Sequence, residues 1–376
     1  ARTQKTRAPG HPHGFSPTPL SMPSVSPPDN DSSAAPSGSP QPARLPASGS
    51  AAPLRIVLCY PAEPHHVAAI QAAAPDAEIV DAGQERVAEE LPSADIFCGH
   101  AKVPVPWDDV VAAGRLRWIQ SSAAGLDHCL VPAVIDSSIT VTSASGVLAD
   151  QVAEHALGLA IACTRRLPLF LAQQAAQEFV RRPTRDLTNA TVGIVGLGGV
   201  GRRIAQVLEP FRCRILATDY FPVDCPPQVA HLGPPRELHD MLSQVDIVFL
   251  AAPLTPQTDG MIDADALAAV RPGTILINVA RGRLVETQAL VDALERGHLD
   301  SAAVDVTAEE PPPAASPLWT APRLIITPHV AGQSQNRIGA MTEFFCDNLS
   351  RYLRGGDLVN LVDKRLGFPE PRTRRR

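Results

Sequence analysis

The sequence lacks the cysteine patterns that hold small domains together or bind zinc. Its seven cysteines are an odd number, and none of them forms a Cys-x-x-Cys pair. Scattered single cysteines are typical of small core residues in a reducing compartment, and they argue against a disulfide framework. We therefore expect no metal site and a cytoplasmic protein. The cysteines stand at positions 59, 98, 129, 163, 213, 225 and 346.

The sequence also lacks a long apolar run and a basic surface. The longest apolar stretch, near 156–163, ends at Arg165, well short of the roughly 18 residues that cross a membrane. The net charge is −6 over 376 residues, with no basic face outside the tails. A negative balance of this kind disfavours binding to nucleic acid. We expect neither a membrane nor a nucleic acid as a partner.

Large apolar residues are almost missing from residues 1–53, where Pro, Ser, Ala and Gly predominate. Such a segment cannot bury enough surface to offset its ordering entropy, so we expect disorder. The first 28 residues contain no acid but do contain Arg2, Lys5 and Arg7. An organellar transit peptide is therefore an alternative for this segment. The density of proline opposes the amphipathic helix of such a signal.

The rest of the chain alternates short apolar strands with helices, a pattern that predicts parallel sheets flanked by helices. In the first half we expect strands at 54–59, 77–80, 95–98, 117–122 and 139–143, and helices at 65–74 and 107–113. A long helix should follow from 148 to 165, with any continuation to 173 kinked or ended by Pro168. In the second half we expect six strands, at 191–195, 214–218, 246–251, 274–279, 302–306 and 324–326. Helices should lie at 202–208, 237–243, 264–270, 286–296 and 336–352.

A glycine turn connects the strand at 191–195 to the helix that follows. Gly196, Gly198 and Gly201 have GxGxxG spacing. The first glycine permits a tight turn, the second lets the backbone approach a pyrophosphate, and the third lets the helix pack closely on the strand. The free N–H groups at the start of such a helix bind an anion. Together these features predict a dinucleotide site.

Asp219 ends the next expected strand, 18 residues after Gly201. At that place a carboxylate can hold the two ribose hydroxyls of NAD. The same carboxylate repels the additional phosphate of NADP, and no arginine occurs among residues 220–222. We therefore expect NAD as the cofactor.

Arg281, Glu310 and His329 each follow a late strand of the second half. In a doubly wound sheet the ligand lies outside the carboxyl ends of the strands, so these side chains should meet at one edge. Reduction of a 2-oxo acid needs a proton donor, and histidine gives and takes protons near neutral pH. Glu310 would favour the protonated imidazole, and the planar fork of Arg281 matches a substrate carboxylate.

Six segments resemble the D-isomer-specific 2-hydroxyacid dehydrogenases, a family that includes glyoxylate/hydroxypyruvate reductases and phosphoglycerate dehydrogenases. The resemblance covers roughly residues 90–360 and depends on the segments 121–128, 152–166, 196–201, 278–286, 304–311 and 327–332. It implies that Arg281, Glu310 and His329 are catalytic. It also implies that Ala124, Gly125 and Arg281 bind the substrate, the first two through backbone N–H groups, and that Asp305 contacts the nicotinamide amide. The expected cofactor-binding residues are Gly196, Gly198, Gly199, Val200, Gly201, Asp219, Ala252, Pro253, Ala280 and Asp305.

The substrate loop departs from the more common Gly-x-Gly of that family, because this chain has Ala123-Ala124-Gly125. The resemblance implies an NAD-dependent oxidoreductase of a small D-2-hydroxy or 2-oxo acid, with glyoxylate or hydroxypyruvate as the expected type, acting as a homodimer. The alternative is an NAD(H)-sensing scaffold like the C-terminal-binding-protein corepressors, which resemble the same family. The proline-rich first 53 residues fit that alternative.

The expected fold is α/β, with two Rossmann-like or flavodoxin-like parallel-sheet domains and an active-site cleft between them. We expect a disordered tail at 1–53, a substrate domain at 54–148 completed by 333–362, an NAD-binding Rossmann domain at 149–332, and a basic tail at 363–376. Its last residues, 372–376, should be solvated.

Overall fold

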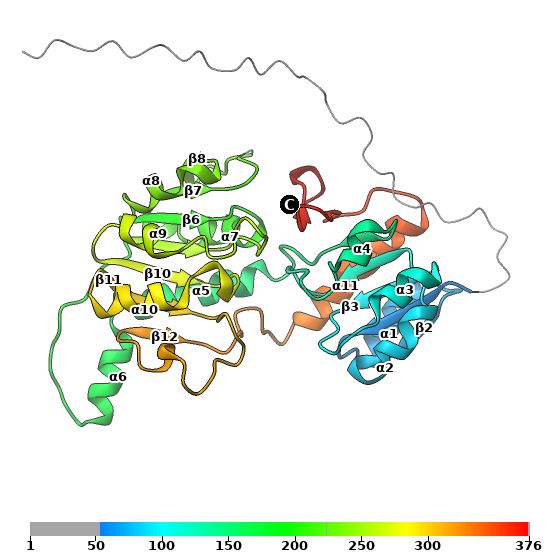
Figure 1. Ribbon diagram of the computed structural model, residues 1–376, viewed down its shortest axis with the longest axis horizontal. Helices are drawn as coiled ribbons and strands as arrows, with labels where there is room; N and C mark the ends of the chain where they lie inside the picture. Colours follow the sequence, from blue (N-terminus) through cyan, green and yellow to red (C-terminus); the bar gives the residue numbers. More distant parts are fainter. Residues whose placement is uncertain (1–52, 223, 375–376) are drawn as a thin grey trace, which may run out of the picture. The chain divides into compact units, whose positions relative to one another are not determined.

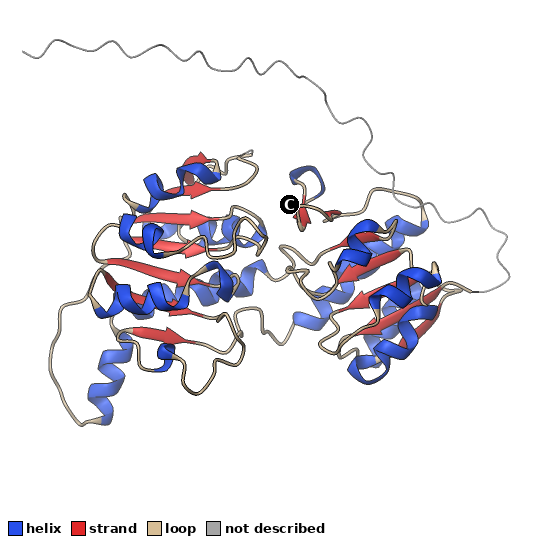
Figure 2. Cartoon of the chain, in the orientation of Figure 1, coloured by secondary structure: helices blue, strands red, loops and turns tan. Residues whose placement is uncertain are grey.

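The computed structural model describes residues 53–222 and 224–374. The disordered tail and the transit peptide considered above lie outside the described residues, apart from Pro53. Two parallel sheets dominate the described part of the chain, and helices cover both faces of each (Figures 1 and 2). We refer to them as the five-stranded and the seven-stranded domain; the exact domain boundaries stay a prediction.

The five-stranded domain has the strand order β2-β1-β3-β4-β5, and every neighbouring pair is parallel. Its strands are β1 Arg55–Cys59, β2 Glu78–Asp81, β3 Ile96–Gly99, β4 Trp118–Ser121 and β5 Thr140–Thr142. Its helices are α1 Pro64–Ala73, α2 Gly83–Glu90, α3 Trp107–Ala113, α4 Pro132–Asp136 and α11 Arg337–Leu353, with a 3-10 turn η1 at Leu91–Ser93.

Helix α11 comes from the far end of the chain but packs on this first sheet. Its Phe345 and Tyr352 share a buried core with β1 and β4. The ring of Trp118 stacks on Tyr352 with centroids 5.0 Å apart, and its Nε1 donates to Thr142 Oγ1 at 2.8 Å. The opposite face of the sheet packs on α2, α3 and α4, as expected for alternating side chains along a strand.

The seven-stranded domain has the order β12-β11-β10-β9-β6-β7-β8, again with every pair parallel. Its strands are β6 Thr191–Val195, β7 Arg214–Thr218, β8 Val229–Gly233, β9 Ile247–Leu250, β10 Thr274–Asn278, β11 Leu299–Val304 and β12 Leu324–Ile326. Its helices are α5 Ala149–Thr164, α6 Leu167–Ala175, α7 Gly199–Val207, α8 Leu238–Leu242, α9 Ala264–Ala269 and α10 Thr287–Glu295. Short 3-10 turns occur as η2 Glu209–Phe211, η3 Pro235–Glu237, η4 Gly282–Leu284 and η5 Pro317–Trp319.

Strand β9 shows how the sheet is buried on both sides. Ile247 and Phe249 belong to the core with α5 and α7, whereas Val248 and Leu250 belong to the core with α8, α9 and α10. All four side chains are at most 1% exposed. Sheets covered on both faces in this way have nearly continuous apolar strands, which is why the pattern was readable in the sequence.

Two sequence expectations for this domain need comment. The sequence predicted six strands, but the described residues contain a seventh, β8, at the edge of the sheet. Its residues His231 and Leu232 are not buried, so this edge strand lacks the apolar run of the others. The expected end of the long helix at Pro168 is confirmed: α5 stops at Thr164, Arg166 has a left-handed backbone with φ 53°, and α6 begins at Leu167.

The described part of the basic tail expected at 363–376 forms secondary structure, and the expectation that 372–376 are solvated is wrong for Arg374, whose side chain is 16% exposed. Strands β13 Val362–Asp363 and β14 Phe368–Pro369 form an antiparallel hairpin, followed by the 3-10 turn η6 Pro371–Thr373. Short elements rich in charge give no periodic signal, and the contacts that order them come from distant parts of the chain.

The glycine turn between β6 and α7 has the geometry that its spacing predicts. Gly196 has φ +91°, and a Cβ there would lie 2.6 Å from the backbone of Ala252. A Cβ at Gly201 would lie 2.1 Å from the carbonyl oxygen of Gly196, so this glycine permits the close packing of helix on strand. A Cβ at Gly198 would meet no atom within 4 Å. The fold requires the first and third glycines, and it leaves open space above the second.

The two substitutions Gly201→Ala and Gly198→Ala should therefore affect stability differently. Gly201→Ala forces a methyl group against backbone and should lower the free energy of unfolding by about 1–3 kcal/mol. Gly198→Ala, at the N-cap of α7, should cost less than about 1 kcal/mol. Urea denaturation followed by circular dichroism measures both. Equal losses for the two variants would contradict the packing role of Gly201.

Candidate functional site

The three residues expected to be catalytic all follow carboxyl ends of strands in the seven-stranded sheet. Arg281 follows β10, Glu310 follows β11 and His329 follows β12. Because these neighbouring strands are parallel, their following loops leave the sheet at the same edge. The glycine turn, which follows β6, opens at that edge as well.

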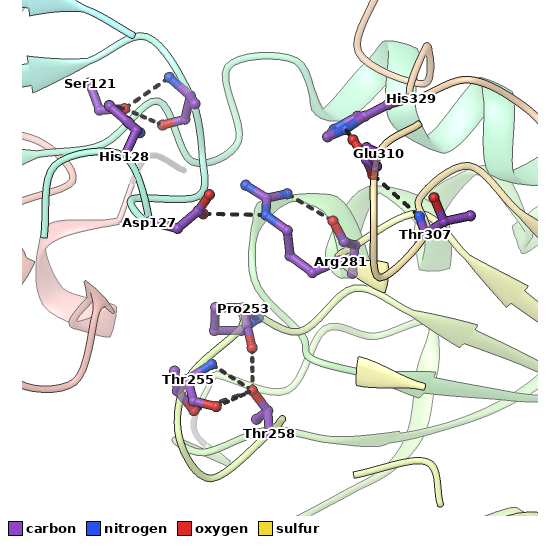
Figure 3. A network of polar contacts seen from close by, with 12 residues as sticks. Ser121, Asp127, His128, Pro253, Thr255, Thr258, Arg281, Thr307, Glu310 and His329 are labelled. Atoms are coloured by element: carbon purple, nitrogen blue, oxygen red, sulfur yellow. Dashed lines mark hydrogen bonds and ion pairs between the residues drawn. The ribbon is translucent and has the colours of Figure 1, made fainter. Parts of the chain in front are cut away.

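His329 and Glu310 form a direct pair. The imidazole Nδ1 lies 2.7 Å from Glu310 Oε2, and both side chains are about half exposed (Figure 3). The second carboxylate oxygen of Glu310 accepts a hydrogen bond from the backbone N–H of Thr307 at 3.3 Å. This arrangement fixes the imidazole ring and directs its other nitrogen, Nε2, away from the carboxylate. A ring held in this way can exchange a proton through Nε2.

The loop that carries His329 is organised by a buried carboxylate. Asp305 is 1% exposed, and its oxygens accept hydrogen bonds from Thr327 Oγ1 at 2.6 Å and from the N–H groups of residues 330–331 at 2.9 Å. His155 Nε2 contacts Thr327 Oγ1 at 3.0 Å from the other side. His329 itself has a left-handed backbone with φ 52°, an uncommon conformation that the surrounding bonds hold. Asp305 therefore positions the histidine; its expected contact with nicotinamide stays a prediction.

Arg281 is held by its own backbone and by the five-stranded domain. Asn278 accepts from the N–H of Ala280 and donates to the carbonyl of Arg281, both at 3.0 Å. The guanidinium donates to the Ala280 carbonyl at 2.8 Å, and its Nε lies 3.5 Å from Asp127 Oδ1 (Figure 3). Desolvation pushes the pKa of Asp127 up, but the attraction of Arg281, a backbone hydrogen bond and the neighbouring His128 together leave that pKa below its usual range.

The substrate loop expected at Ala124 and Gly125 meets the same guanidinium. A Cβ at Gly125 would lie 1.6 Å from an Arg281 Nη atom, so the guanidinium packs directly against the backbone at this position. Ser121 closes the turn before it, because its hydroxyl accepts from the N–H of Ala123 at 3.0 Å. Backbone N–H groups and a guanidinium are thus close enough to bind one carboxylate between them.

His100 and His128 were not among the site residues predicted from the sequence. Their rings stack with centroids 4.0 Å apart, and His128 Nε2 lies 3.4 Å from Ser121 Oγ. Burial lowers the pKa of both, and together with the neighbouring His100 it brings that of His128 to about 3. The pair is therefore uncharged at neutral pH. The strand-end rule, applied to β3 and β4 as it was to the late strands, would have found His100 and Asp127.

Asp219 lies at the opposite end of the candidate site, next to the glycine turn. It is 8% exposed, and its carboxylate accepts from the N–H of Leu197 at 2.7 Å and from the N–H of Phe221 at 2.8 Å. The carboxylate thus faces the start of α7. The open space at Gly198 and the free N–H groups of α7 fit the pyrophosphate of a dinucleotide, with Asp219 beside the turn for the adenosine ribose.

The remaining expected cofactor residues line the loops around this turn. Gly199 packs against the loop before α5, since a Cβ there would lie 2.5 Å from Gly146 Cα. The carbonyl of Pro253 accepts from Thr258 Oγ1 at 2.7 Å, which shapes the loop after β9 (Figure 3). The contacts of Val200, Ala252 and Ala280 with a cofactor stay predictions.

None of the described helices is both long and apolar enough to cross a membrane. Within residues 53–222 and 224–374, no group of three or more His, Cys, Asp or Glu could hold a metal ion.

Comparison with known proteins agrees with the resemblance seen in the motifs. Residues 157–331 match the family model of the NAD binding domain of the D-isomer specific 2-hydroxyacid dehydrogenases. The D-3-phosphoglycerate dehydrogenase of Mycobacterium bovis is 33% identical over 262 residues, which are 68% of this chain and 49% of that protein. The present chain thus spans about half the length of that relative.

The glycerate dehydrogenase of Methylorubrum extorquens is 32% identical over 281 residues, which are 72% of this chain and 86% of that protein. Among solved structures, a D-isomer specific 2-hydroxyacid dehydrogenase from Xanthobacter autotrophicus Py2, in complex with NADPH and MES, has a TM-score of 0.72 and 28% identity. The alignment covers 84% of this chain and 100% of that one.

The family predicted from the six segments is confirmed by these matches. Most of the glycerate dehydrogenase aligns with this chain, and the matched NAD binding domain contains the glycine turn, Arg281 and His329. The chain therefore belongs to the D-isomer specific 2-hydroxyacid dehydrogenase family, and NAD is its cofactor.

Proposed function

We propose that the chain transfers a hydride between nicotinamide and C2 of a small D-2-hydroxy or 2-oxo acid of the glyoxylate or hydroxypyruvate type. The observation that carries the proposal is the 2.7 Å pair of His329 and Glu310. These residues follow β12 and β11, which lie in the sheet order β12-β11-β10 with the strand that precedes Arg281. The relative named glycerate dehydrogenase supports this substrate class, because hydroxypyruvate is the 2-oxo form of glycerate. The relatives named phosphoglycerate dehydrogenase keep a phosphorylated substrate among the compounds to test.

When bound, NADH supplies the hydride that reduces C2 of the substrate. Arg281, with the backbone N–H groups of residues 124–125, binds and orients the substrate carboxylate. His329 Nε2 donates the proton that the alkoxide oxygen needs, and it removes that proton in the oxidative direction. Glu310, bonded to Nδ1, keeps the ring in place with Nε2 directed away from the carboxylate.

The neutral pair His100 and His128 lies beside this carboxylate site. Because burial keeps both rings uncharged, they add hydrogen-bonding surface without adding positive charge near Arg281. Ala123 and Ala124 carry only methyl side chains in the substrate loop. We infer that substrate size is controlled by this loop, with glyoxylate and hydroxypyruvate as the first compounds to compare.

The sequence also predicted a homodimer, and we propose that α6 and the segment after it form the contact between the two copies. Leu171 is 64% exposed and Phe179 is 100% exposed, and Leu167, Leu169 and Val180 extend the same apolar stretch. Exposed apolar stretches of this kind on a soluble domain mark sites of protein association. Figure 1 shows α6 beside a long loop that returns to β6.

The proposed reaction is tested by a screen of NADH oxidation over 2-oxo acids of increasing side-chain size, with and without His329→Gln. The wild-type chain should oxidise NADH with glyoxylate or hydroxypyruvate. His329→Gln should lower turnover by about 10²–10⁴ because the proton donor is lost. Binding of NADH, measured by fluorescence titration, should not change.

A surface pair of the same chemistry provides the control. His231 Nε2 lies 2.8 Å from Glu237 Oε2 at the edge of the seven-stranded sheet, so His231→Gln removes a matched pair on a different strand from those that precede Arg281, Glu310 and His329. Unchanged turnover in His329→Gln would remove this histidine from the mechanism. Tight NADH binding without turnover of any 2-oxo acid would favour the scaffold alternative instead.

Arg281→Lys should separate substrate binding from cofactor binding. Lysine keeps the charge but loses the planar fork, so KM for the 2-oxo acid should rise about tenfold or more. The Kd for NADH should stay within about twofold. The neighbouring Arg283, exposed and paired with Asp259, provides the control Arg283→Lys. An Arg281→Lys variant with an unchanged KM would contradict carboxylate binding by the guanidinium.

The dimer contact is tested by placing charge on α6 and the segment after it. Leu171→Glu with Phe179→Asp should convert the dimer to a monomer, because the apolar surface that the two copies bury becomes charged. Light scattering after size-exclusion chromatography measures the mass. Val103→Glu, at a different exposed apolar residue, is the control and should leave the mass unchanged. A monomeric wild-type chain would overturn the proposal.

A further inference from the structure

The C-terminal hairpin, residues 361–374, contacts the seven-stranded domain at the end of β7. The ring of Phe368 lies edge-on to Tyr220 and Phe221, with centroids 5.7 and 6.1 Å apart. These two aromatic residues come directly after Asp219, the carboxylate expected at the adenosine ribose. On its other side the hairpin is anchored to the five-stranded domain, where Lys364 Nζ donates to the carbonyl of Val134 at 3.0 Å.

The hairpin brings an arginine to Asp219. Arg374 Nη2 lies 3.7 Å from Asp219 Oδ1, and the two side chains are only 16% and 9% exposed. The Nε of Arg374 donates to the carbonyl of Pro369 at 3.2 Å, and Thr373 is tied back through its hydroxyl to Leu361 at 3.0 Å. The guanidinium is therefore held in place by the hairpin that carries it.

The sequence argument for NAD depended on an unopposed carboxylate. Residues 220–222 supply no arginine, so Asp219 alone should repel the 2′-phosphate of NADP. The structure places a cation beside Asp219 from a part of the chain 155 positions further on. A charge at this distance, and only slightly exposed, cancels much of the repulsion that the carboxylate exerts on a second anion. Its planar fork also matches a phosphate.

We propose that Arg374 is a coenzyme-specificity residue, which binds the 2′-phosphate of NADP(H) and so narrows the preference for NAD(H) that Asp219 creates. Asp219 keeps its role toward the ribose hydroxyls of NAD, because both of its oxygens are oriented by backbone N–H groups and not by Arg374. The proposal rests on the cofactor domain and not on the proposed substrate, and it is tested by binding alone.

The test measures the Kd of NADH and of NADPH by fluorescence titration of the full chain. Arg374→Gln should raise the Kd of NADPH about tenfold or more, the usual effect of losing a hydrogen bond to a charged group, and that of NADH less than about threefold. Arg365→Gln removes the same charge from the exposed turn of the same hairpin and should change neither value. Phe368→Ser, which removes the aromatic contact, should also raise the Kd of NADPH.

A second background distinguishes a direct contact from an effect exerted through Asp219. In the Asp219→Ala variant, adding Arg374→Gln should still raise the Kd of NADPH, because the guanidinium touches the phosphate itself. Loss of the Arg374 effect in that background would overturn the proposal and make Arg374 a positioning residue for the carboxylate. Equal tightening of both coenzymes in Arg374→Gln would also overturn it, because the hairpin would then be competing with the adenosine half.

Discussion

The candidate site depends on the common direction of neighbouring strands. Every pairing in the seven-stranded sheet is parallel, so the loops after β6, β10, β11 and β12 leave at one edge although their residues are far apart in sequence. That constraint puts an anion-binding helix start, a guanidinium and a histidine–carboxylate pair on one side of the sheet. The buried Asp305 then fixes the position of His329, because it accepts hydrogen bonds from the loop that carries this residue.

Local patterns predicted most of the fold because the sheets are buried on both faces. Strands such as β9 and β10 are continuous apolar runs bounded by polar turns, and such runs can be recognised without knowing their partners. The edge strand β8 and the hairpin of β13 and β14 were not predicted from the sequence, for the opposite reason. Their residues are mixed in polarity, and tertiary contacts, such as Phe368 against Tyr220, determine their structure.

The site was predictable to the extent that each residue follows a strand end. Arg281, Glu310 and His329 do so, and the pairing of the last two was expected before any coordinates. Arg374 could not be found in that way, since nothing local links a C-terminal arginine to a carboxylate after β7. Asp127 is an intermediate case, because the strand-end rule applies to it but only the structure shows its contact with Arg281.

The contact between Asp127 and Arg281 has a consequence for substrate binding. Asp127 is 62% exposed, and its oxygen lies 3.5 Å from the guanidinium, so this ion pair belongs to the weak, solvent-screened class. An incoming carboxylate that also receives the N–H groups of the Gly125 loop makes more hydrogen bonds than Asp127 does. In the proposed reaction, exchange of one carboxylate for the other would therefore cost little, and Asp127 would keep the guanidinium oriented until the substrate replaces it.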